Sequence, residues 1–234
     1  MISLEEILFS QGFGSRRECM ALVYGGRVAV NGVVQDSPEA EFNEAGLVFE
    51  VDGVRWPYFE KAIVAMNKPA GYECSMKPLH HPGVMTLLPP PLRVRGLQPV
   101  GRLDEDTTGL LVLTDDGALN HRLTHPKRHV RKTYEAQLKH PATEALSEAL
   151  MRGVQLTDEP RPVAAVSARL LDAQRLEIVL EQGKYHQVKR MVAAAGNRVE
   201  SLRRVQFGAL RLPESLELGK WVFISSAAEI TGKR

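Results

Sequence analysis

Apolar residues recur at helical spacing twice near the start of the chain, and a Ser-x-x-Glu pair precedes them each time. Ser3 with Glu6 and Ser15 with Glu18 match the capping box, in which two side chains satisfy free N–H groups at a helix start. Glycines follow both stretches and predict where the helices end. The predicted inward positions are Leu4, Ile7 and Leu8 in the first helix and Cys19, Leu22 and Val23 in the second.

The hydrophobic period then changes from helical to alternating. Residues 27–30 and 33–35 flank Asn31-Gly32, the dipeptide most typical of a two-residue hairpin turn. A further strand is predicted at 46–51, and the pattern is interrupted near Pro57. Two short helices and a hairpin predict a compact module, with a domain boundary near residue 60.

Strand patterns outnumber helix patterns in the rest of the chain, and they do not alternate regularly with helices. This arrangement favours an α+β fold with a mixed, largely antiparallel sheet over a doubly wound one. The predicted strands are 62–66, 110–114, 130–138, 163–171, 176–180 and 199–205, and the predicted helices are 142–152 and 185–195. The prolines at 89–91 predict a loop.

Length and composition limit the class of protein. The 234 residues suit one large domain or a small one with a medium one, and we predict domains 1–60 and 61–234. With 44% apolar and 25% charged residues the chain is a folded globular protein. No apolar stretch approaches membrane-spanning length, and the first residues are acidic where a signal peptide is basic. The two cysteines are far apart in the sequence and do not suggest a disulfide framework. We therefore expect a cytoplasmic protein.

The net charge of +2 is unevenly distributed. Residues 1–60 hold four basic and ten acidic residues, whereas the remainder holds 26 basic and 18 acidic ones. Three acid-poor segments, 61–103, 118–134 and 182–211, contain much of this basic excess. Such segments can be solvated surfaces, but three in one domain favour a polyanionic partner.

The most informative segment runs from Gly101 to Gly117. Asp104, Glu105 and Asp106 precede an apolar strand, and Asp115-Asp116 follow it in what we predict to be a turn. A carboxylate on a loop entering a buried strand suits a nucleophile or a base. From spacing alone a plain polar loop, a pair of glycosidase carboxylates and a magnesium site all remain open.

Four ordered motifs resemble those of the pseudouridine synthases, in the branch that acts on ribosomal RNA. The segment Gly-Arg-Leu-Asp-Glu-Asp-Thr-Thr-Gly-Leu at 101–110 resembles the catalytic motif. The others are Asn67-Lys68-Pro69, Lys132-Thr133-Tyr134 and Gly183-Lys184-Tyr185-His186-Gln187-Val188-Lys189-Arg190, with Leu202-x-Arg204-x-x-x-Gly208 closing the set. Phe207 and Gln206 depart from the pattern, and we expect both outside the catalytic set.

The resemblance implies a role for several residues. Asp104 would be the nucleophile that isomerises uridine, attacking either the ribose or the uracil ring. Tyr134 would stack on the base, and Lys189 would pair with the catalytic carboxylate. Arg102 would contact a phosphate and help to extrude the base. The remaining predicted substrate contacts are Asn67, Lys68, His186, Gln187 and Arg190.

The N-terminal module resembles an S-four type RNA-binding domain. The matching residues are Gly14-Ser15-Arg16-Arg17 and Gly26-Arg27-Val28-x-Val30-Asn31-Gly32. The resemblance implies RNA contacts for Arg16, Arg17 and Arg27. The alternative is that these arginines only decorate a surface, and the acidic balance of residues 1–60 is an argument for that alternative.

We expect no cofactor, because no nucleotide-binding fingerprint occurs, and no metal. His121, His125 and His129 recur every four residues, but Pro126 interrupts any helix that would align them. The sequence predicts a monomeric isomerase of small-subunit (16S) ribosomal RNA, acting on an assembling particle. The alternatives are a large-subunit (23S) enzyme, a non-catalytic RNA-binding assembly factor, and a nucleosidase that releases free base.

Overall fold

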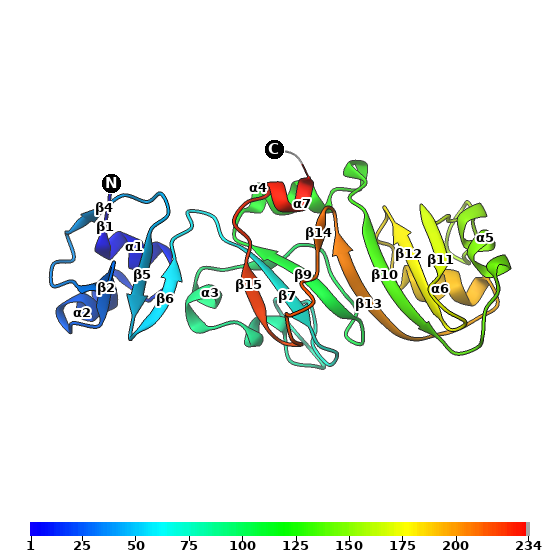
Figure 1. The fold of residues 1–234 in the computed structure, drawn as a ribbon, viewed down its shortest axis with the longest axis horizontal. Coiled ribbons are helices and arrows are strands. Elements are labelled where there is room, and N and C mark those ends of the chain that lie inside the picture. The colour runs from blue at the N-terminus through cyan, green and yellow to red at the C-terminus, as the bar shows by residue number, and fades with distance from the viewer. Residues whose placement is uncertain (233–234) are drawn as a thin grey trace. The chain divides into compact units, whose positions relative to one another are not determined.

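The computed structural model describes residues 1–232. The chain forms two compact units, each with its own core (Figure 1). The first unit comprises Met1–Ala62 and Met85–Gln98, and the second comprises Ile63–Val84 and the chain from Pro99 onward. The linear pattern did not predict that residues 85–98 pack with the N-terminal module.

The first unit packs two capped helices on a small antiparallel sheet. The Ser15 side chain accepts from the Glu18 N–H, and the Glu18 side chain accepts from the Ser15 N–H, so the predicted capping box is present. Asn31 and Gly32 both have positive φ, as the predicted hairpin turn requires. The sheet order is β3-β2-β5-β6, with β1 and β4 paired separately. The elements are β1 (Ile2–Ser3), α1 (Leu4–Ser10), α2 (Arg16–Tyr24), β2 (Val28–Val30), β3 (Val33–Val34), β4 (Glu41–Phe42), β5 (Val48–Val51), β6 (Val54–Pro57) and α3 (Pro90–Val94).

Helix α3 corrects the prediction of a loop around the prolines. Pro90 occupies the first helical position, where a missing N–H costs nothing. Gly12 has φ +87, and a Cβ there would collide with the Pro91 carbonyl oxygen. Arg95 donates to the Gln11 side chain and to the Phe59 carbonyl oxygen. These contacts attach residues 85–98 to the N-terminal module.

The second unit is built on one mixed sheet in the order β11-β12-β10-β13-β9-β7-β15. Its pairs within the described residues are antiparallel except for β13 with β9, which confirms the predicted α+β class with a largely antiparallel sheet. The strands are β7 (Ile63–Lys68), β9 (Thr108–Thr114), β10 (Lys132–Leu138), β11 (Ser167–Leu170), β12 (Arg175–Leu180), β13 (Val199–Phe207), β14 (Leu210–Arg211) and β15 (Trp221–Phe223), and the two-residue β8 (Gln98–Pro99) pairs with β9.

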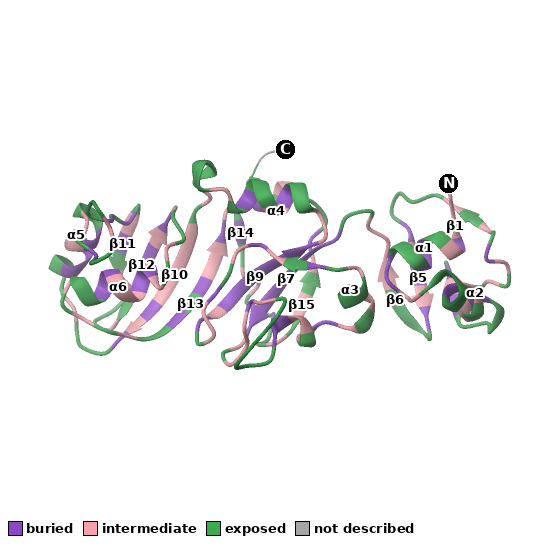
Figure 2. Cartoon of the chain, turned by 180° about the vertical axis from the view of Figure 1, so that it is seen from behind, coloured by how far each residue is buried: buried purple, intermediate pink, exposed green. Residues whose placement is uncertain are grey.

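Helices and turns complete two cores on this sheet. Helices α5 and α6 pack with β10, β11 and β12, and α4 and α7 pack with β7 and β9. Every residue of β7 and all but the first residue of β9 are buried, and these two strands are largely purple in Figure 2. The helices are α4 (Gly117–Thr124), α5 (Glu144–Arg152), α6 (Gln187–Ala194) and α7 (Ala228–Thr231), with 3-10 turns at Val84–Leu87 and Pro126–Arg128. No helix within residues 1–232 is long and apolar enough to cross a bilayer.

The residues of the predicted turn at Asp115-Asp116-Gly117 lead directly into helix α4, of which Asp116 is the N-cap and Gly117 the first residue. The Asp116 side chain accepts from the Leu119 N–H at 2.9 Å and so caps the helix. Aspartate favours both turns and helix caps, and eight helical residues follow it.

Gly109 marks the closest approach between strands in the second unit. It pairs with Lys68 of β7 and Arg204 of β13, and its φ is +101. A Cβ there would lie 2.9 Å from the Arg204 nitrogen and collide with its carbonyl oxygen.

We expect Gly109→Ala to lower the free energy of unfolding by about 3 kcal/mol, because it combines positive-φ strain with overpacking. Urea denaturation measures this change. Gly117→Ala is the matched control: its Cβ has open space, so its stability should stay within about 1 kcal/mol of the wild type. Equal effects of the two substitutions would contradict this account.

Candidate active site

A buried lysine holds the loop that carries Asp104. The Lys68 side chain is 0% exposed, and its ammonium donates to the carbonyl oxygens of Pro69, Asp104, Glu105 and Thr107 at 2.9–3.1 Å. Burial lowers the pKa of Lys68, while nearby acidic groups oppose the shift. Four carbonyls on one cation fix the path of the loop just before β9.

The Asp104 carboxylate lies between two basic side chains. His186 Nε2 is 3.5 Å from one carboxylate oxygen, and Lys189 Nζ is 3.6 Å from the other. Lys189 is closer to Asp106, to which it donates at 2.6 and 2.8 Å. The predicted pairing partner of Asp104 is therefore present, but Asp106 shares it, and the spacing of the motif gave no indication of this.

The turn before α6 sets the positions of both basic groups. His186 adopts a left-handed conformation with φ +46 and stacks on the Tyr185 ring at a centroid distance of 3.8 Å. The Gln187 side chain accepts from the Lys184 N–H at 3.0 Å, which closes the turn. Lys189 then projects from the first turn of the helix, whereas Val188 packs in the core.

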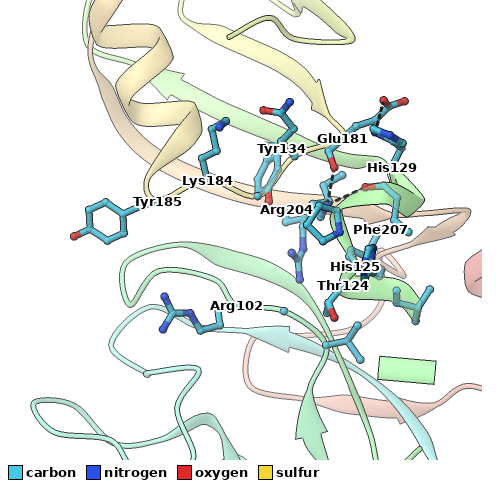
Figure 3. A pocket seen from close by; sticks show the side chains of 18 of the residues that line it. Arg102, Thr124, His125, His129, Tyr134, Glu181, Lys184, Tyr185, Arg204 and Phe207 are labelled. Carbon is cyan, nitrogen blue, oxygen red and sulfur yellow. Dashed lines mark hydrogen bonds and ion pairs between the residues drawn. The ribbon is translucent and has the colours of Figure 1, made fainter. Parts of the chain in front are cut away.

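Asp104 lines a cavity of about 720 Å³ within the second unit (Figure 3). Tyr134 reaches it from β10, and the exposed Arg102 reaches it from the loop that carries Asp104. Arg204 and Phe207 contribute from β13. The three predicted groups of most interest, Asp104, Tyr134 and Arg102, thus come together at one cavity.

Two cations lie at the Phe207 end of this cavity. Arg204 is 1% exposed, donates from Nε to the Leu110 carbonyl oxygen at 2.8 Å, and lies 5.1 Å from the Phe207 ring centroid. Lys132 donates to the carbonyl oxygens of Val130 at 2.9 Å and Glu181 at 3.3 Å. Burial, reinforced by Arg204 and opposed by Glu181, lowers the pKa of Lys132 to about 8. The Phe207 ring forms part of the cavity wall.

Three predicted substrate contacts lie inside the protein instead. Asn67 donates to the Leu216 carbonyl oxygen at 2.6 Å, Lys68 supports the loop, and Gln187 closes the turn. All three are at most 5% exposed, and none lines the cavity. Their polarity satisfies backbone groups, so the structure contradicts direct substrate contact from their side chains.

Other predicted residues are held by neighbours outside the cavity. Arg190 pairs with Asp158 and donates to the Tyr185 carbonyl oxygen. In the first unit Arg16 pairs with Glu5 at 2.7 Å, Arg27 pairs with Asp52 at 2.6 Å, and Arg17 is exposed.

The three spaced histidines do not share a helix face. His121 lies in α4, His125 follows its end, and His129 has a left-handed backbone. Among residues 1–232, no three His, Cys, Asp or Glu side chains are grouped as metal ligands.

We expect Lys68→Met to lower the free energy of unfolding by about 2–3 kcal/mol, because buried carbonyls lose their donor. Urea denaturation measures the change. Lys77→Met is the control, since this exposed lysine should tolerate replacement within about 0.5 kcal/mol. A Lys68 variant as stable as the control would contradict the supporting role.

The Lys132 amine should make stability depend on pH. In the folded protein it loses its proton near pH 8, whereas the unfolded chain keeps its proton to about 10.5. The unfolded state therefore binds more protons between these values, and the free energy of unfolding should rise with pH there. The difference in the free energy of unfolding between wild type and Lys132→Met isolates this contribution. If that difference does not change from pH 8 to 10, the lowered pKa of Lys132 is contradicted.

This chain is similar to known proteins over most of its length. A family model described as RNA pseudouridylate synthase matches residues 62–194. The ribosomal small subunit pseudouridine synthase A of Haemophilus influenzae is 39% identical over 201 residues, covering 86% of this chain and 84% of that one. The protein of the same name from Yersinia pestis is 37% identical over 197 residues, covering 84% and 80%.

A solved structure gives the same result. A crystal structure of a pseudouridylate synthase superposes with a TM-score of 0.69 at 32% identity, and the match covers 98% of both chains. This likeness confirms the family resemblance seen in the motifs and extends over nearly the whole chain. The chain belongs to the RNA pseudouridylate synthase family.

Proposed function

We propose that this protein isomerises a uridine of small-subunit ribosomal RNA to pseudouridine, with Asp104 as the attacking carboxylate. The observation that carries the proposal is the position of this carboxylate. It lies on a fixed loop, between His186 and Lys189, at the wall of a cavity that also contains Tyr134. The similar proteins named small subunit pseudouridine synthase A support the choice of RNA.

The reaction needs an ionised carboxylate in a partly enclosed place. The Asp104 side chain is 31% exposed and lies beside the basic groups of His186 and Lys189. The carboxylate attacks either the ribose anomeric carbon or the uracil ring, and both routes require the glycosidic bond to break and re-form at C5. Asp106 acts on Lys189, which it positions through two short hydrogen bonds.

Tyr134 supplies a flat surface for the base. Its ring is half-buried on β10 and lines the cavity, so a uracil can stack on it. A base inside folded RNA must leave its stack to reach this depth. The exposed Arg102 at the same cavity then contacts a phosphate of the extruded nucleotide.

The first unit contributes a second RNA contact in this proposal. Arg17 is exposed, and the ion pairs of Arg16 and Arg27 lie on the surface, where exchanging a carboxylate for a phosphate costs little. The assembling small subunit is the proposed substrate, and the enzyme acts on it as a cytoplasmic monomer.

We expect Asp104→Asn to abolish pseudouridine formation, with a loss of at least about 10³-fold, because a neutral amide cannot act as the nucleophile. The measurement is carbodiimide modification of 16S ribosomal RNA followed by reverse transcription. Wild-type enzyme should create one new stop in 16S RNA and none in 23S RNA.

Glu105→Gln is the matched control, because it changes the neighbouring carboxylate and keeps the loop backbone. This variant should retain the stop. A stop that persists in Asp104→Asn would refute the nucleophile, whereas a stop only in 23S RNA would refute the small-subunit substrate. Release of free uracil would identify a nucleosidase, and silence of the wild type with bound RNA would identify an assembly factor.

A further inference from the structure

Arg204 has a free donor at the cavity. Its side chain is 1% exposed, and Nη2 is buried without a hydrogen-bond partner among the described residues. Burying a guanidinium nitrogen without a hydrogen-bond acceptor costs free energy. An acceptor on a bound ligand would remove this cost. Figure 3 shows Arg204 and Tyr134 directed into the same part of the cavity.

The positive charge at this position is not neutralised by a bonded carboxylate. The Arg204 Nε donates to a main-chain carbonyl oxygen, and so does the neighbouring Lys132 ammonium. The Glu181 carboxylate is engaged elsewhere, with Arg131 at 3.2 Å and His129 at 3.5 Å. Lys132 and Arg204 therefore present unbalanced positive charge to whatever fills the cavity.

The sheet register places Arg204 at the edge of a base stacked on Tyr134. The two residues are direct partners across β10 and β13, so their side chains share one face, with Cβ atoms about 5 Å apart. A flat base can pass into the cavity as far as Arg204. The RNA backbone is bulkier and remains near the exposed Arg102, so a ring oxygen suits Arg204 better than a phosphate does.

Uracil offers the acceptors that this donor needs. The ring carries O2 and O4 on either side of the N3–H group. When the C1′–N1 bond breaks, its electron pair stays on the ring, and the resulting negative charge is shared by these two oxygens. The C5 electron pair then forms the bond to C1′, and where Asp104 has attacked C1′ this step displaces the Asp104 carboxylate. The C5 proton leaves to a base and N1 takes a proton, so no oxidant or other reactant is needed.

The geometry of the rearrangement makes one donor sufficient. A half turn of the ring about the line through N3 and C6 exchanges N1 with C5, and the same turn exchanges O2 with O4. A donor that binds one carbonyl before the turn therefore binds the other afterwards. Cytosine carries an amino group at C4, which would place a donor against the Arg204 donor.

We propose that Arg204, assisted by the Lys132 charge, binds a carbonyl oxygen of the flipped uracil, stabilises the negative charge on the detached ring, and selects uracil over cytosine. The inference rests on the proposed isomerase function and adds a catalytic residue to it. Fixed donors directed at developing charge in an enclosed site are a large source of rate enhancement.

The test crosses enzyme variants with RNA analogues. The substrate is a 16S ribosomal RNA segment transcribed with UTP, 4-thio-UTP or 2-thio-UTP, in which sulfur replaces one carbonyl oxygen with a weaker acceptor. Isomerised nucleoside is quantified by chromatography after digestion, and kcat/KM is obtained for each pair. Effects of sulfur on RNA folding cancel in the ratio between enzymes, because all enzymes receive the same RNAs.

We expect wild-type enzyme to prefer the oxygen substrate over each thio substrate by about tenfold, since the bond involves a charged donor. Arg204→Met should lose about 100-fold on the oxygen substrate and show a preference near one. If Arg204→Met shows no cooperative thermal transition, it is not folded. In that case the oxygen preference of Arg204→Lys tests the inference. In arginine, Nε and Nη2 are donors at two separate positions, one at the Leu110 carbonyl oxygen and one at the base. A lysine ammonium occupies a single position, so the preference should fall below about threefold.

Phe207→Leu is the control for packing, because it changes the ring beside Arg204 without removing a donor. Its activity should fall equally on all three RNAs, which leaves the tenfold preference intact. A folded Arg204 variant that keeps this preference would overturn the inference and leave Arg204 a structural residue. An inactive wild type on every RNA would overturn the proposed function, and this inference with it.

Discussion

The buried Lys68 ammonium is the interaction on which the rest of the site depends. A charge this far from water is expensive, and here backbone carbonyls of the catalytic loop, not a carboxylate, compensate for it. These bonds also set the direction of the loop. Because the carbonyl oxygens point inward to the cation, the Asp104 carboxylate stays at the cavity wall between His186 and Lys189. The position of the loop is thus set by bonds within the protein.

The sheet connects this loop to the opposite end of the cavity. Strand β9 begins where the loop ends, and its parallel pairing with β13 brings Arg204 beside Gly109. The Arg204 Nε bond to the Leu110 carbonyl oxygen crosses the same junction. Only glycine permits so close an approach of the two backbones. The loop that carries Asp104 and the buried Arg204 guanidinium are therefore joined through strand β9.

Local rules predicted the fold class, the capped helices and the hairpin well, because caps and an Asn-Gly turn depend on a few adjacent residues. The motifs also placed Asp104, Tyr134 and Lys189 at one site. Sequence could not show whether a polar residue points outward or inward, so Lys68, Asn67 and Gln187 were assigned to substrate when they support backbone. Arg204 carried no such assignment, because its importance lies in a missing partner, which only three-dimensional packing reveals.

The basic groups around Asp104 and those at the Phe207 end of the cavity differ in what lies beside them. Lys189 and His186 lie beside the Asp104 and Asp106 carboxylates. Within residues 1–232, Arg204 and Lys132 are hydrogen-bonded to carbonyl oxygens and to no carboxylate, and burial, reinforced by Arg204, lowers the pKa of Lys132. In the proposed reaction, a negative charge that can balance Arg204 and Lys132 forms on the uracil ring as the glycosidic bond breaks. The protein thus favours the reacting state over the bound uridine, which is the condition for a binding interaction to increase the rate.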